Sequence, residues 1–220
     1  MNQSIVRIIL TYVRSVKYIS HDELKEKSDT VCKLYDEHVD MEDIIEEINH
    51  QLNRFSFKID SNLNEITNQM CYSFINLKNE EQNDKDIYKQ FTNFKESDIL
   101  AIKGIIDLIF ENNYSFNMDR LVNSLTQFGK SHQDAYVLVN KLISQGWLER
   151  IGGDIVVTVR LKLELRGYLE KFDLLICHQC NNIVTVGYIW EGKALHQRCL
   201  EIVRRREEVG EVRKIGLDVN

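Results

Sequence analysis

Two short cysteine and histidine motifs near the carboxyl end carry the residues best suited to chemistry. Cys177 and Cys180 form a CxxC pair, and His196 and Cys199 form an HxxC pair that begins after fifteen intervening residues. A tight turn can aim ligands separated by two residues at one ion, and thiolates with an imidazole suit tetrahedral Zn²⁺. The alternative is two reduced cysteines beside an unrelated histidine and cysteine. The spacing favours zinc, since three of the five cysteines fall within 23 residues.

We therefore predict one structural zinc ion, held by Cys177, Cys180, His196 and Cys199. Four protein ligands close the tetrahedron and leave no position for a catalytic water. His178 could compete with His196 for the metal, but its place between two ligands in a tight turn argues against this. No cysteine or histidine follows Cys199, so the second ion of a cross-braced RING domain has no complete ligand set.

Composition limits the classes of protein to which the chain could belong. Its 220 residues, 43% of them hydrophobic, suffice for two or three small domains with cores of their own. The net charge of −6 argues against broad DNA affinity, which needs clustered Lys and Arg. The odd number of cysteines and the CxxC pair indicate a reducing compartment. We find no Gly-rich phosphate loop and no hydrolase or transferase constellation.

The amino-terminal apolar stretch predicts a soluble helix. Its apolar residues from Ile5 to Val16 recur at helical spacing, and Arg7 and Arg14 interrupt the run. No apolar run approaches the length that spans a bilayer. We therefore expect neither a signal peptide nor membrane association.

Helices and hairpins then follow one another in the same order twice. In residues 1–77, Ser20 with Glu23 forms a capping box for a second helix, and Asp40 can cap a third. Period-two segments at 55–59 and 71–75 then predict a hairpin. Three helices followed by a hairpin is the order of a winged helix.

The second copy begins after a charged, asparagine-rich stretch. Apolar periodicity predicts helices near 99–110, 118–125 and 131–145, and Gly146 stands where a helix turns left-handed. A compact hairpin follows at 147–159, with Gly152 and Gly153 in its turn, and then a closing helix from about Arg160 to Phe172.

We predict an α+β, mostly helical chain: tandem winged-helix domains followed by a small one-zinc RING-derived module. The expected boundaries are 1–77 for the first winged helix, 78–96 for a linker, 97–172 for the second winged helix, 173–203 for the single-zinc module and 204–220 for a charged tail. The alternative is an irregular helical protein whose two hairpins are coincidental.

The predicted third helices do not suit DNA. Residues 41–53 carry four acidic side chains and neither Lys nor Arg, and residues 131–145 offer only Lys141 against Asp134, so neither has the set that reads base edges. The arginines of the tail are interleaved with glutamates, which is typical of a solvated face. We expect direct DNA binding to be weak or absent, although a DNA-binding winged-helix factor stays as an alternative.

Two winged helices, a closing helix and a carboxy-terminal cysteine–histidine module together resemble the non-SMC element one family of the SMC five/six chromosome-maintenance complex. The resemblance runs from about residue 1 to 200 and is most specific at 43–52, at Gly146-Trp147-Leu148 and at 175–180 with 196–199. It implies a nuclear, chromosome-associated scaffold subunit in DNA repair and recombination. The implied partners are the MAGE-like non-SMC element three and the kleisin non-SMC element four, with the SMC arms reached indirectly.

The resemblance also implies a variant RING with ubiquitin-ligase activity assisted by the MAGE-like partner. This chain departs from that pattern, because residues 187–192 replace the family's middle CxxC and the final C-P-x-C is absent. The polar Gln179 stands where a RING usually presents an apolar residue to the conjugating enzyme. We therefore expect a scaffold that docks no conjugating enzyme alone, with RING-type E3 ubiquitin ligase activity as the alternative.

Overall fold

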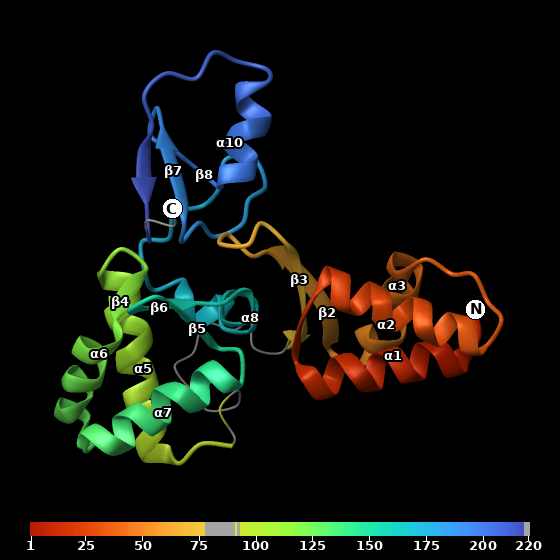
Figure 1. Cartoon of the computed structure of the whole chain (residues 1–220), viewed down its shortest axis with the longest axis horizontal. Helices are drawn as coiled ribbons and strands as arrows, with labels where there is room; N and C mark the ends of the chain where they lie inside the picture. Colours follow the sequence, from red (N-terminus) through yellow and green to blue (C-terminus); the bar gives the residue numbers. More distant parts are fainter. Residues whose placement is uncertain (78–90, 92, 218–220) are drawn as a thin grey trace.

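The computed structural model describes residues 1–77, 91 and 93–217. Across these residues the helices and strands form two helical units and a smaller carboxyl-terminal module, and each contains an antiparallel sheet of three strands (Figure 1). Most of the predicted linker, at 78–90 and 92, and the last three residues of the predicted tail lie outside the described residues. No described helix is both long enough and apolar enough to cross a bilayer.

The first unit packs three helices against its sheet. Its elements are α1 (Gln3–Val16), β1 (Tyr18–Ser20), α2 (His21–Leu34), α3 (Met41–Leu52), η1 (Asn53–Phe55), β2 (Phe57–Leu63) and β3 (Met70–Asn76). The strand order is β1-β3-β2. The predicted capping box of Ser20 and Glu23 is present at the start of α2. Asp40 is the N-cap residue of α3, but its side chain makes no capping hydrogen bond.

The second unit repeats this order of elements. It comprises α5 (Glu96–Glu111), β4 (Ser115–Asn117), α6 (Met118–Ser124), η3 (Leu125–Phe128), α7 (His132–Ser144), β5 (Leu148–Ile151), β6 (Asp154–Val157), α8 (Val159–Glu164) and α9 (Arg166–Leu169). The strand order β4-β6-β5 matches that of the first unit. Gly146 has φ +72° after α7, a left-handed conformation that favours glycine. The closing helix is broken at Leu165 into α8 and α9.

The carboxyl-terminal module begins after α9. It contains β7 (Gly187–Trp190), β8 (Lys193–Leu195), α10 (Gln197–Arg204) and β9 (Arg213–Ile215), with strand order β8-β7-β9. The segment predicted as a tail therefore adds a strand to this sheet, where Ile215 pairs with Gly187 and is buried. A single apolar residue among charged neighbours gives no period-two signal, which is why this strand is not evident from the sequence.

The apolar residues form two separate cores. One belongs to the first unit alone and includes Ile5, Ile44 and Ile59. The other runs from the second unit into the carboxyl-terminal module, so that Ile105 and Leu195 belong to the same cluster. Hydrophobic burial thus joins the second unit to the module. The first unit has its own core and meets the rest where β2 and β3 contact α8.

Candidate metal centre

The four predicted ligands lie together in the carboxyl-terminal module. One ligand atom from each of Cys177, Cys180, His196 and Cys199 can be chosen so that all four lie within 4.8 Å of one another. Among the described residues this is the one group of three or more His, Cys, Asp or Glu side chains placed to hold a metal ion. His178 is exposed and is not part of the group.

A tight turn presents the two cysteines of the first motif. The backbone N–H of Cys177 donates to the Asn182 carbonyl at 2.8 Å, and the N–H of Asn181 donates to the Cys177 carbonyl at 2.9 Å. Asn181 has φ +58°, a left-handed conformation that asparagine tolerates better than most residues. The turn thereby brings both Sγ atoms to one side.

The start of α10 presents the second motif. His196 is the N-cap residue of this helix, with φ −64° and ψ 158°, and Cys199 lies in its first turn. Residues three apart share one face of a helix, so both side chains point back toward the cysteine turn. The fifteen residues between the two motifs include the β7–β8 hairpin. Glu191 and Gly192 form its turn, and both have positive φ.

The ring of His196 has one side toward the sulfurs and the other toward oxygen acceptors. Its Nδ1 lies 3.3 Å from Cys180 Sγ and 3.8 Å from Cys199 Sγ. Its Nε2 lies 3.1 Å from a carboxylate oxygen of Glu65 and 3.2 Å from the Ile183 carbonyl oxygen. Nδ1 is therefore the nitrogen placed to bind a metal. Nε2–H is placed to donate to a carboxylate, as is common for histidine ligands.

Burial and charge suit such a donor set. Burial would raise the pKa of the Cys177 thiol, but hydrogen bonds from the His196 ring and from backbone N–H groups lower it to about 5. Burial would lower the pKa of His196, but Cys177 and Glu65 raise it to about 11. Burial raises the pKa of Cys199 to about 11. A metal binding at Cys199 and at Nδ1 of His196 would release their protons, which makes its affinity dependent on pH.

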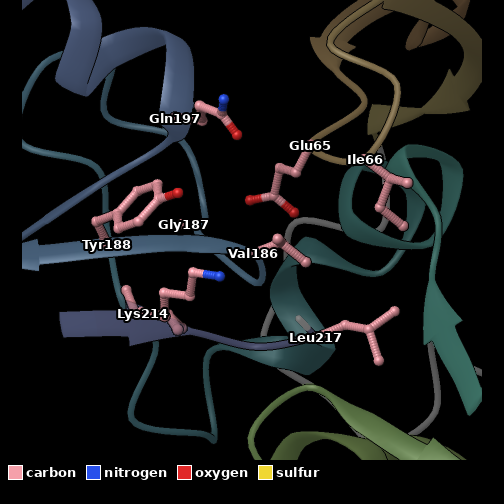
Figure 2. Close-up of a pocket in the computed structure, with 9 residues that line it drawn as sticks. Glu65, Ile66, Val186, Gly187, Tyr188, Gln197, Lys214 and Leu217 are labelled. Atoms are coloured by element: carbon pink, nitrogen blue, oxygen red, sulfur yellow. The ribbon is translucent and has the colours of Figure 1, made fainter. Parts of the chain in front are cut away.

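Glu65 is a site residue that the sequence interpretation missed. It comes from the β2–β3 loop of the first unit, yet its side chain is 3% exposed and points toward the module (Figure 2). Burial would raise the pKa of Glu65, but Lys162 and His196 lower it to about 2. A glutamate in a polar loop gives no sequence signal of a partner more than a hundred residues away.

The loop that carries Glu65 is held by its own side chains. Asn64 Oδ1 accepts from the backbone N–H groups of Ile66 at 2.9 Å and Thr67 at 3.1 Å. Beside Glu65 a pocket of about 70 Å³ opens between this loop and the strands β7 and β9 (Figure 2). Because small-molecule sites usually measure roughly 300–1,000 Å³, this pocket does not suit a substrate.

Both polar and apolar side chains are exposed beside the two cysteines of the first motif. Gln179 is exposed beside Cys180, and Ile176 is 44% exposed beside Cys177. Residues 187–190 form strand β7. On α3, Glu42, Asp43 and Glu46 are exposed, as expected for a helix that repels phosphate.

Comparison with known proteins places the chain among relatives of one kind. A family model described as the Nse1 non-SMC component of the SMC5-6 complex matches residues 7–130. The non-structural maintenance of chromosomes element 1 of Schizosaccharomyces pombe is 24% identical over 202 residues, which are 88% of this chain and 84% of that protein. The human homolog is 25% identical over 169 residues, covering 73% of this chain and 62% of its own length.

A solved structure of an Nse1-Nse3-Nse4 complex contains a chain of similar fold. The TM-score is 0.78 at 17% identity, and the match covers 94% of this chain and 92% of that one. The similarity therefore extends over both helical units and the carboxyl-terminal module.

Proposed function

The chain belongs to the Nse1 family of non-SMC components of the SMC5-6 complex, and from this we propose that it is a scaffold subunit of that complex. The proposed partners are a MAGE-like Nse3 subunit and a kleisin Nse4 subunit, with the SMC arms reached through them. The observation that carries the proposal is the fold similarity, over 94% of this chain, to a chain solved in an Nse1-Nse3-Nse4 complex. Such a subunit would act in the nucleus, on chromosomes, in DNA repair and recombination.

We further propose that the two helical units are winged-helix domains, spanning 1–77 and 97–172, and that a single-zinc module follows from 173. The repeated strand orders β1-β3-β2 and β4-β6-β5 support this, since each hairpin follows three helices and pairs with a short strand from between the first two. Phe91 and Phe94 also belong to the core of the second unit, so these two residues before the proposed boundary pack onto the domain.

The proposed metal is one structural Zn²⁺ held by Cys177, Cys180, His196 and Cys199. Three sulfurs and one imidazole nitrogen form a donor set that zinc prefers, and four protein ligands leave no open position. The ion would brace the module by joining the cysteine turn to α10. Residual ubiquitin-ligase activity is the second candidate, favoured by the ligand pairs that this module shares with a variant RING.

The test of the scaffold proposal is assembly. Co-expressed with Nse3 and Nse4 subunits from its source, the chain should elute with both as one stoichiometric complex in size-exclusion chromatography. Glu42→Lys with Glu46→Lys should weaken that complex if α3 faces a partner. Glu207→Lys with Glu208→Lys is the matched control, because it reverses the same charge on exposed residues after α10. Failure of the three chains to co-elute at micromolar concentration would refute the proposal.

A further inference from the structure

One carboxylate contacts the group of four candidate ligands from a different part of the fold. Glu65 belongs to the first unit, Lys162 to α8 of the second unit, and Thr185 and His196 to the carboxyl-terminal module. We propose that Glu65 is the positioning residue that orients His196 for the metal and binds the first unit to the module, so that metal binding stabilises the contact between the first unit and the module. This inference rests on the proposed zinc site.

The geometry of Glu65 uses both of its oxygens. Oε1 accepts from the backbone N–H of Thr185 at 2.8 Å and lies 3.1 Å from His196 Nε2. Oε2 accepts from the Lys162 ammonium at 2.6 Å and from the Thr185 hydroxyl. An ionised carboxylate is an acceptor with two oxygens, and here donors from two other parts of the fold fill both. Glu65 and Lys162 are each 3% exposed at the side chain, so little water is available to replace a lost contact.

Within the described residues, the first unit does not share a hydrophobic core with the module. The core of the first unit is separate from the core that the second unit shares with the module. Another polar contact across this boundary in the described residues joins Ser73 Oγ to Glu164 Oε1 at 3.4 Å, which is long for a strong hydrogen bond. The Glu65 contacts therefore join the first unit directly to the module, in addition to the contacts of β2 and β3 with α8.

The His196 ring takes part both in the proposed metal site and in the contact with Glu65 of the first unit. A metal on Nδ1 fixes the orientation of the ring and leaves Nε2–H as a donor to Glu65. A ring protonated at both nitrogens also donates from Nε2, so the metal strengthens this contact by fixing the ring rather than by supplying the donor. In return, a carboxylate that accepts from Nε2–H orients the ring and makes it a better ligand. Because each contact favours the other, removal of the metal should weaken the Glu65 contact, and removal of the carboxylate should weaken metal binding.

The experiment compares zinc binding and amide hydrogen exchange in the full chain. Glu65→Gln keeps the size of the side chain and removes its charge. Asp60→Asn on β2 is the matched control, since it changes the charge equally at a carboxylate that pairs with Lys58 and accepts from the Ser61 N–H, both in the first unit. Competition with a chromophoric chelator should show roughly 10- to 100-fold weaker zinc binding for Glu65→Gln, and less than twofold change for the control. The Thr185 amide should exchange faster in the Glu65 variant alone.

A second measurement requires no variant. Chelation of zinc from the wild-type chain should speed exchange in the β2–β3 loop, at residues 64–68, while the amides of α1 stay protected by their own core. If Glu65→Gln leaves both the zinc affinity and the protection of the Thr185 amide unchanged, the proposed role of Glu65 is refuted and the zinc site is not. A wild-type chain that binds no zinc would overturn both. The two failures are therefore distinguishable.

Discussion

The indole of Trp147 is the side chain whose removal should most damage the second unit. It is 1% exposed and belongs to the largest fully buried side chains. The Phe91 ring lies 4.6 Å from it between centroids, and the Arg160 guanidinium lies 3.9 Å from the centre of the indole. Trp147→Ala therefore removes a buried aromatic side chain, its ring contact with Phe91 and the ring face that the buried Arg160 guanidinium contacts.

The expected loss can be worked from these contacts. Truncation of a buried aromatic to alanine costs about 3–5 kcal/mol, and a desolvated cation–π contact is worth about 2 kcal/mol. Arg160 keeps its ion pair with Glu164, at 2.6 Å, so its charge is not left unpaired. We therefore expect Trp147→Ala to lower the free energy of unfolding by roughly 5–7 kcal/mol, against about 5–15 kcal/mol for a typical protein.

Urea unfolding followed by circular dichroism measures this loss in the full chain. The control is Tyr136→Ala, because Tyr136 is 47% exposed on α7 and surface changes usually stay within about 0.5 kcal/mol. The variant should also retain less zinc, since the second unit and the metal module share one core. A loss below about 1 kcal/mol would refute the packing of this core around Trp147, because such a loss is typical of surface substitutions rather than buried aromatics.

Three further predictions concern the metal, the pH dependence and the ligase alternative. Metal analysis should return one zinc per chain. Cys177→Ala should unfold the module, because a structural zinc site contributes on the order of 10 kcal/mol of apparent binding free energy to folding. The helical circular dichroism of the first unit should remain. Burial would raise the pKa of Asp98, but Lys130 lowers it below the ordinary 3.8. The folded state therefore loses stability as the pH falls below that value, and Asp98→Asn should remove this part of the acid dependence seen in unfolding curves. The isolated chain should not accelerate the single-turnover discharge of ubiquitin from loaded conjugating enzymes, and the chain with Nse3 should accelerate it at most weakly. A clear acceleration that Cys180→Ala abolishes would favour the ubiquitin-ligase function.

Features that depend on local spacing were predictable from the sequence. The CxxC turn and the start of α10 each bring two candidate ligands together by local geometry, so the sequence could predict that these four residues lie close to one another. The capping box at Ser20 and the left-handed Gly146 are local in the same sense. Apolar periodicity likewise located α3 and α7, because a face buried against one core repeats at helical spacing.

Features that depend on distant partners were not predictable. The strands β1 and β4 are three residues long, too short for a period-two pattern, and they exist because β3 and β6 offer free edges to them. The break of the closing helix at Leu165 leaves no mark in the apolar pattern. Glu65 is one of 34 acidic residues, and only the folded chain shows that it is buried.

The chemistry of the Glu65 contact also explains why the first unit is joined in this way. An apolar joint would hold the units together whether or not the metal were bound, since burial is non-directional. A buried carboxylate is favourable only while its donors stay in place, because a charge left without partners in the interior is strongly destabilising. One of its donors, His196, belongs to the proposed zinc site. The contact made by Glu65, Lys162, Thr185 and His196 is therefore specific in geometry, and if His196 binds the metal as we propose, the contact is also sensitive to the metal.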